Sequence, residues 1–253
     1  MNASSIQKPR PFRQDGYTLI EIMIALVVAL FLLGGLGTLV AGTRRTGSNQ
    51  TALAQLQDEQ RLAMSILTDV IQNAGTFDSA TYYTATNAWT TTKTVPANSA
   101  MSLVSGQAIV GTHSTTLPGD TLAVRYATNG SDNIMNCVGG SNPGTATTYI
   151  NYFVINGSNQ LTCSPTGNTS DAVVLVNNIA NMQIYYGVVT VGGSMNSVDT
   201  YMTASQVTNW LNVASVRLTL GFVNPLASQP GQLPYVFFTR VIALQPRGGA
   251  VFP

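Results

Sequence analysis

Apolar residues run without interruption along the first part of the chain. No side chain between Ile22 and Thr43 is ionisable. At ~1.5 Å per helical residue, this run is long enough to cross a ~30 Å hydrocarbon core. Glu21 lies one helical turn inside the apolar segment, where an unpaired charge is costly. The pattern predicts a membrane-spanning helix whose single carboxylate needs a partner.

The pattern then becomes amphipathic. Apolar positions and one glutamine recur at alternating intervals of three and four residues: Leu53, Leu56, Gln60, Ala63, Leu67, Val70 and Ala74. Gly75 follows, as is typical of the residue after a helix end. We therefore predict one long helix over residues 17–74, with its first half in a membrane and its second half packed on a sheet. A free coiled-coil seam over residues 44–74 is the alternative.

Strand-like runs of β-branched and aromatic residues dominate the rest of the chain. Six strands are predicted: Thr121–Tyr126, Tyr149–Ile155, Ala172–Val176, Met182–Val189, Ala214–Val223 and Val236–Leu244. Most of these runs are not separated by a helix long enough for a parallel crossover, so the predicted sheet is mainly antiparallel. One short helix is predicted over Ala204–Asn212.

Residues 76–119 lack a sustained pattern. We interpret them as a long, irregular connection between the helix and the sheet, with one short strand pair formed by Ser102–Val104 and Ala108–Val110. Its aromatic residues are predicted to pin it to the core: Tyr82, Tyr83 and Trp89.

Charge is scarce along the whole chain. Only 8% of the 253 residues are charged, against ~25% in an average soluble domain. The surface is instead rich in Thr, Ser, Asn and Gly, which favours an exported protein over a cytosolic enzyme. From Tyr17 onward there are eight basic and nine acidic side chains. This balance gives no electrostatic case for nucleic-acid binding.

The first 16 residues form a polar, basic segment that contains Lys8, Arg10 and Arg13. A secretory signal would place its apolar region before the cleavage site, whereas here the apolar region comes after the Gly16-Tyr17 junction. Basic residues on both flanks of the span favour a cytoplasmic leader only weakly.

The residues GYTLIE at positions 16–21 resemble the cleavage and methylation site of type IV prepilins. This resemblance implies that a prepilin peptidase cuts after Gly16 and methylates the new amino terminus at Tyr17, where Phe is usual. The new amine and the Glu21 carboxylate would lie four residues apart on one helix face. Opposite charges at this spacing could neutralise each other within one subunit or, as the family implies, between neighbours in a filament.

Three later stretches resemble the PilW type of minor pilin: residues 52–77, 174–188 and 210–222. The turn Cys137-Val138-Gly139 is similar to one found in that family. The resemblance implies an α+β pilin fold, in which a long N-terminal helix packs on a mainly antiparallel β-sheet domain. It divides the chain into a cleaved leader (1–16), a transmembrane and filament-core segment (17–43), an amphipathic stalk (44–75) and a periplasmic domain (76–253).

Cys137 and Cys163 are the only cysteines. In an exported, weakly charged domain they are best interpreted as a disulfide. Two free buried thiols remain an alternative, and so does a metal site, although it would need further ligands. His113 is the only histidine, and no catalytic set with serine and aspartate is evident around it.

The PilW resemblance implies a subunit that is not an enzyme, with no catalytic residues, no metal and no cofactor. Its implied partners are other minor pilins, the major pilin, the prepilin peptidase, the inner-membrane assembly platform and a tip adhesin. The protein would insert in the inner membrane and then enter the pilus, within a complex that initiates assembly. A J-type pseudopilin of type II secretion, a periplasmic enzyme with a single-span anchor and a DNA-uptake pilin are alternatives.

Overall fold

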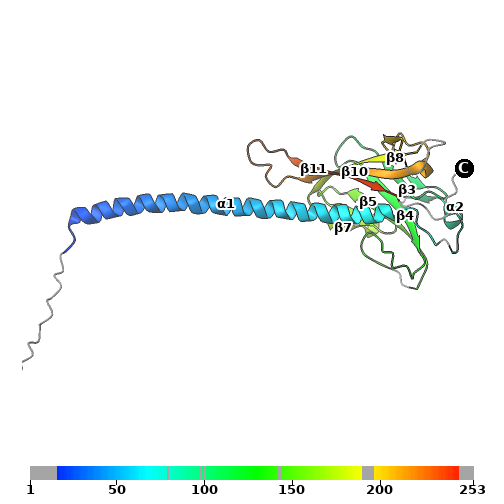
Figure 1. Ribbon diagram of the computed structural model, residues 1–253, viewed down its shortest axis with the longest axis horizontal. Helices are drawn as coiled ribbons and strands as arrows, with labels where there is room; N and C mark the ends of the chain where they lie inside the picture. The colour runs from blue at the N-terminus through cyan, green and yellow to red at the C-terminus, as the bar shows by residue number, and fades with distance from the viewer. Residues whose placement is uncertain are drawn as a thin grey trace, which may run out of the picture. The chain divides into compact units, whose positions relative to one another are not determined.

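The computed structural model describes residues 16–78, 80–96, 99, 101–141, 144–189 and 197–244. The predicted leader therefore lies outside the described residues, except for Gly16. The chain divides into two units, Met1–Thr51 and Ala52–Pro253. One helix, α1 (Leu19–Gln72), contributes to both (Figure 1). Each unit is described by itself below.

The first unit is helical from Leu19 onward. The carbonyl oxygen of Thr18 accepts hydrogen bonds from the backbone N–H groups of Glu21 and Ile22, at 3.1 and 3.3 Å. Every residue from 16 to 48 is exposed. By length and composition, this helix could cross a membrane.

The second unit buries one side of the remaining helix. The predicted stripe is confirmed at Leu56, Ala63, Leu67, Val70 and Ala74, and Met64 and Ile71 widen it. Its first member, Leu53, is instead exposed. The helix ends at Gln72, and Gly75 adopts a φ of +85°, a conformation that favours glycine.

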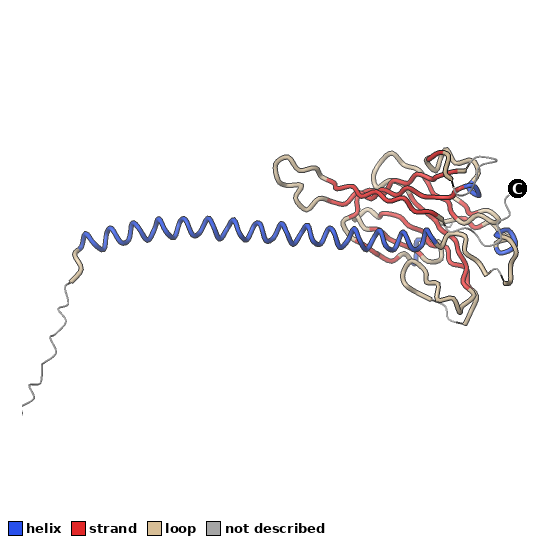
Figure 2. Tube along the Cα trace, in the orientation of Figure 1, coloured by secondary structure: helices blue, strands red, loops and turns tan. Residues whose placement is uncertain are grey.

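Two antiparallel sheets make up most of the second unit (Figure 2). The five-stranded sheet follows chain order: β3 (Ile109–Thr112), β4 (Thr121–Thr128), β5 (Thr147–Ile155), β6 (Leu161–Ser164) and β7 (Val173–Val176). The four-stranded sheet has the order β11 (Tyr235–Ala243), β10 (Val213–Val223), β8 (Ile179–Val188) and β9 (Thr200–Met202). A separate hairpin pairs β1 (Lys93–Thr94) with β2 (Ser102–Leu103).

The six predicted strands are confirmed, and all strand pairs are antiparallel. The α+β fold class, with a long N-terminal helix and antiparallel sheets, is likewise confirmed, and this arrangement is consistent with a pilin fold. The predicted pairing of Ser102–Val104 with Ala108–Val110 is wrong, because β2 pairs with β1 and β3 pairs with β4. Strands β1, β6 and β9 escaped prediction, because two- to four-residue strands leave almost no periodicity to read.

Both faces of the five-stranded sheet are covered. Tyr149 and Phe153 of β5 pack in the main core with the second half of α1, whereas Ile150 and Tyr152 pack in a smaller cluster. That cluster includes Leu103 of the β1–β2 hairpin. Burial on both faces explains why the sequence of β5 is a nearly continuous apolar run rather than a strict alternation.

The helix predicted over Ala204–Asn212 is wrong apart from its last turn. Only a 3-10 turn, Trp210–Asn212, forms there. The side chain of Gln206 accepts hydrogen bonds from the backbone N–H and the hydroxyl of Thr203, and Asn209 accepts one from the N–H of Leu211. These side chains bond the local backbone and so favour turns over a continuous helix.

The long connection after α1 is irregular, as predicted, with one short helix, α2 (Ala85–Ala88). Trp89 pins it to the core, where its ring meets Phe77 edge-on at a centroid distance of 5.8 Å. The prediction is wrong for Tyr82 and Tyr83, which are both exposed. A tyrosine can keep its hydroxyl in water, so an aromatic residue in a loop is not by itself evidence of burial.

Candidate functional site

The N-terminal residues of the first unit form the first candidate site. Tyr17 and Glu21 line the same shallow groove on the helix, together with Ile22, Ala25 and Leu26. Glu21 lies in the first helical turn, where a carboxylate interacts favourably with the helix dipole. The groove is otherwise apolar. A single acidic group at its end can therefore pair with a cation that enters alongside an apolar surface.

The rest of this helix presents apolar side chains in every direction. The exposed residues include Leu30, Phe31, Leu33 and Leu39, each with more than 60% of its surface accessible. A helix that is apolar on all sides is stable only when lipid or other protein surrounds it. The first unit therefore supplies a membrane anchor or a helix-bundle element.

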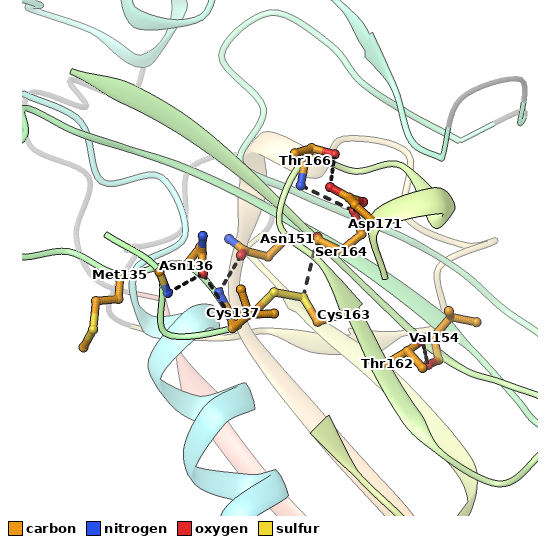
Figure 3. The surroundings of a disulfide bond; sticks show 12 residues. Met135, Asn136, Cys137, Asn151, Val154, Thr162, Cys163, Ser164, Thr166 and Asp171 are labelled. Carbon is orange, nitrogen blue, oxygen red and sulfur yellow. Dashed lines mark hydrogen bonds between the residues drawn. A yellow bond between two sulfur atoms is a disulfide. The ribbon is translucent and has the colours of Figure 1, made fainter. Parts of the chain in front are cut away.

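A disulfide between Cys137 and Cys163 constrains the second unit (Figure 3). Cys137 lies in the β4–β5 connection, and Cys163 lies in β6, 26 positions further along. The Asn136 side chain accepts hydrogen bonds from the N–H groups of Val138 and Gly140, at 3.0 and 2.9 Å. The disulfide therefore ties this side-chain-stabilised turn to β6, an inner strand of the five-stranded sheet.

Asp171 follows the same strand. Burial alone would raise the pKa of its carboxyl, but hydrogen bonds donated by the hydroxyls of Ser164 and Thr166, both at 2.6 Å, outweigh that effect. The pKa of Asp171 therefore lies below its ordinary value. These bonds fix the chain immediately after Cys163 (Figure 3).

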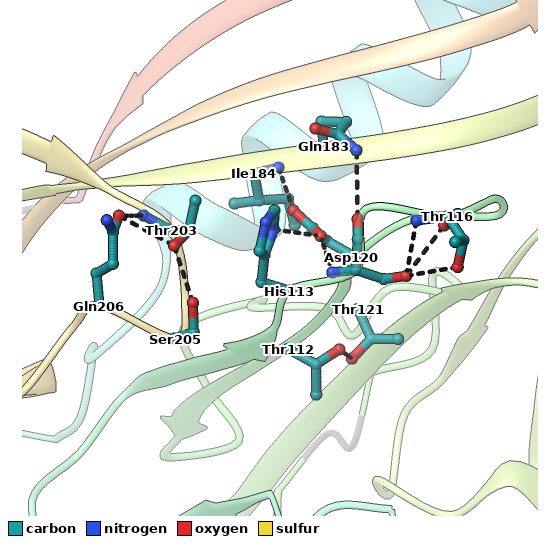
Figure 4. A network of polar contacts seen from close by, with 11 residues as sticks. Thr112, His113, Thr116, Asp120, Thr121, Gln183, Ile184, Thr203, Ser205 and Gln206 are labelled. Atoms are coloured by element: carbon teal, nitrogen blue, oxygen red, sulfur yellow. Dashed lines mark hydrogen bonds and ion pairs between the residues drawn. The ribbon is translucent and has the colours of Figure 1, made fainter.

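His113 is a satisfied side chain rather than an evident catalyst. Its Nδ1 lies 3.0 Å from Oδ1 of the buried Asp120, which also accepts the backbone N–H groups of Ser114 and Ile184 (Figure 4). The Ser114 hydroxyl is engaged with Thr116. Asp120 therefore links the start of β4 to the middle of β8, and the three residues do not form a Ser-His-Asp relay.

Sequence reasoning missed Arg125, the largest fully buried side chain of the second unit. Its guanidinium donates to the carbonyl oxygens of Gln107 and Val104 at 2.9 and 2.7 Å, and it lies 4.8 Å from the centre of the Trp89 ring. The sequence signal that could have identified it is a single cationic residue within an otherwise apolar strand. Among the described residues, no group of three His, Cys, Asp or Glu side chains is placed to hold a metal ion.

Comparison with known proteins gives two matches to family models. Residues 11–37 match the prokaryotic N-terminal methylation motif, a range that includes Gly16, Tyr17 and Glu21. Residues 151–230 match the type IV pilus-assembly protein W model, which here covers β5 to β10. No curated protein and no solved structure matches the chain. With the long apolar helix and the antiparallel sheets, these matches show that the chain is a PilW-like, type IV pilin-like assembly protein.

Proposed function

We propose that this protein is a non-enzymatic minor pilin that helps to initiate assembly of a type IV pilus. The observation that carries the proposal is the methylation-motif match on an exposed helical segment in which Glu21 is the only ionisable side chain from Leu19 to Thr43, followed along the chain by a PilW-like domain. In this proposal the helix over residues 17–43 holds the protein in the inner membrane, with residues 76–253 in the periplasm. Mature subunits then leave the membrane and join other minor pilins in a priming or tip complex.

Processing would create the charged group that pairs with Glu21 during assembly. Cleavage after Gly16 would leave a methylated, cationic amine on Tyr17, whereas Glu21 carries the only ionisable group of the apolar segment. Tyr17 and Glu21 line one groove, so an amine entering from a neighbouring subunit meets the carboxylate on an otherwise apolar surface. A paired charge is much less costly than an isolated one away from water. The pair therefore favours packing of subunits in register.

The test compares Glu21→Gln with a matched variant in the same helix, Asp58→Asn. Asp58 is exposed and belongs to the second unit. Both variants should be cleaved normally, with mature protein that begins at methylated Tyr17 by mass spectrometry. Glu21→Gln should reduce the amount in sheared pili at least about tenfold, which corresponds to ~1.4 kcal/mol of lost pairing energy, whereas Asp58→Asn should incorporate normally.

Two results would overturn the proposal. One is normal incorporation of Glu21→Gln into pili. The other is protein that still begins at Met1 in cells with an active prepilin peptidase. Gly16→Trp should block cleavage and so provides the reference for this unprocessed form. Cross-linking of the processed protein to other minor pilins would support the initiation role. Cross-linking only to pseudopilins of a secretion system would assign it to that machine instead.

A further inference from the structure

β11 is an outermost strand of the four-stranded sheet, and in the described part of the chain no strand pairs with its other side (Figure 1). It has nine residues, whereas the other outermost strands of the two sheets, β3, β7 and β9, have three or four. It contains no proline or lysine, and it pairs with β10 without a register shift. Prolines, lysines and bulges usually protect an exposed edge from pairing with another chain. The edge of β11 is therefore open to an additional strand.

The backbone of every second residue of β11 points to this open edge. The N–H of Asn224 donates to the carbonyl oxygen of Pro234 at 2.9 Å. The N–H of Val223 donates instead to Asn178, immediately before β8, at 2.8 Å. Because backbone direction alternates along antiparallel strands, Tyr235, the partner of Val223, turns its backbone groups away from β10. The same holds at each second position, which gives five residues with outward backbone groups: Tyr235, Phe237, Thr239, Val241 and Ala243.

Three of these five residues also have well-exposed side chains. Phe237 and Val241 have 55% and 57% of their surface accessible, and Thr239 is exposed as well. They lie on the face of β11 opposite to Ile242, which is buried in the main core. A strand added to this edge would find apolar cross-strand neighbours on the outer face.

A groove of about 370 Å³ lies beside the strand, between β11 and the second half of α1. Arg61 of the helix and Arg240 of the strand both line it, and both are exposed. Arg240 donates one hydrogen bond to the hydroxyl of Thr68 at 3.2 Å, which leaves it further donors, and Arg61 has no ion pair with a described residue. The acidic residues of this part of α1 do not line the groove: Asp58, Glu59 and Asp69. The groove therefore favours a carboxylate.

A second copy of this chain fits the open edge poorly. Arg240 is the only charged residue of β11, so two paired β11 strands would bring another arginine to a groove that already contains two. We propose that β11 pairs with an extended segment of a partner protein, which adds a strand to the sheet and places a carboxylate side chain in the groove with Arg61 and Arg240. Main-chain hydrogen bonds provide the affinity, and the two arginines select an acidic segment.

A synthetic peptide of the length of β11 provides the probe. It has nine residues of alternating threonine and valine with a central glutamate, is capped at both ends and carries a neutral fluorescent dye. A matched peptide has glutamine at its centre. Fluorescence anisotropy measures the binding of each peptide to the full-length protein in a non-ionic detergent. We expect saturable binding of the glutamate peptide, with a dissociation constant of about 100 μM or lower, and at least about fivefold weaker binding of the glutamine peptide.

Thr239→Pro tests the pairing of the edge. The N–H of Thr239 points away from β10, so proline removes a donor to the added strand and none from the pair with β10. This variant should weaken binding of the glutamate peptide at least about tenfold. Thr239→Ala is the matched control, because it keeps the N–H while it loses the same hydroxyl contact with Thr219, and it should bind as the wild type does. Circular dichroism checks that each variant is folded.

Arg61→Gln tests the charge of the groove. It should weaken binding of the glutamate peptide at least about fivefold and have little effect on the glutamine peptide. Lys93→Gln removes an exposed cation of β1 that does not line the groove, so it should leave both affinities unchanged.

The proposal fails in any of three cases: no saturable binding of the glutamate peptide; equal affinity for the two peptides; or equal effects of Thr239→Pro and Thr239→Ala. A dimer in sedimentation experiments that Thr239→Pro dissociates would assign the edge to a second copy and would also overturn the proposal. These measurements use the purified protein and a synthetic peptide. Their outcome is therefore independent of cleavage after Gly16 and of incorporation into pili.

Discussion

The two halves of α1 are both helical, but they differ in how their apolar side chains are exposed. Residues 19–43 expose apolar side chains on all sides, whereas residues 56–71 bury a single stripe against the sheets of the second unit. Composition explains the difference. The first half has no polar face and so needs lipid or other helices around it, while the second half has one face for water and one for the core. A continuous helix can therefore contain both a segment that needs lipid or other helices around it and a segment that forms part of a folded domain.

The largest test of this contrast is the same truncation made in each half. Leu67→Ala should lower the free energy of unfolding of the domain by about 4 kcal/mol, because Leu67 is completely buried and its removal leaves a cavity. Leu36→Ala should change it by less than about 0.5 kcal/mol, because Leu36 is exposed in the first unit. Urea unfolding of the full chain in detergent, followed by tryptophan fluorescence, measures both values.

Equal losses in the two variants would break the comparison, because they would mean that the first half also supports the fold of the domain. A loss below about 1 kcal/mol for Leu67→Ala would likewise contradict the packing of the second half.

Removal of the disulfide should have the next largest effect, again confined to the second unit. The double variant Cys137→Ala/Cys163→Ala frees a loop closed over 26 positions, for which chain entropy gives a loss of about 3 kcal/mol. Far-ultraviolet circular dichroism should show that the helical signal of the first half persists in detergent beyond the unfolding midpoint of the domain. Wild-type protein under strong reductant is the control and should match the double variant.

Loss of that helical signal at the unfolding midpoint of the domain would contradict this prediction. It would indicate that the two units unfold as one cooperative structure.

The features predicted from sequence are those encoded by local pattern. The apolar run, the stripe from Leu56 to Ala74 and the glycine after the helix each depend on neighbouring residues, and the structure has all three. The six predicted strands were also readable, because five of them are eight to eleven residues long and their β-branched and aromatic residues stand out from polar turns. The methylation-motif match covers a stretch that is equally local.

The features that escaped prediction depend on residues far apart in the chain. The wrongly predicted strand β2 pairs with β1, and its Leu103 packs with Ala123 of β4 and Ile150 of β5, which are distant in sequence and leave no local signal. A cavity of about 540 Å³ in the second unit is likewise lined by residues that are far apart in the chain: 88–91, 93, 125, 136, 147–150 and 165–166. The unexpected burial of Arg125 follows from its carbonyl partners, which lie 18 or more positions away.

The smallest expected effect is on the stability of the domain at acidic pH. The pKa of Asp171 is lowered in the folded domain, against about 3.9 in an unfolded chain. Between these two values the unfolded chain binds more protons, so stability rises with pH. The contribution of Asp171 is therefore present above about pH 4 and is lost as pH falls through the folded value. Asp171→Asn should make domain stability less dependent on pH between about 5 and 3 than it is in the wild type.

Glu21→Gln provides the matched control, because it changes a carboxylate in the first unit and should leave the pH dependence of domain unfolding unchanged. Urea midpoints measured at several pH values in detergent give both curves. If Asp171→Asn followed the wild-type curve, the hydroxyls of Ser164 and Thr166 would not stabilise the charged carboxylate. If Glu21→Gln flattened the curve, a carboxylate of the first unit would contribute to the stability of the domain, and the contrast between the two halves of α1 would fail.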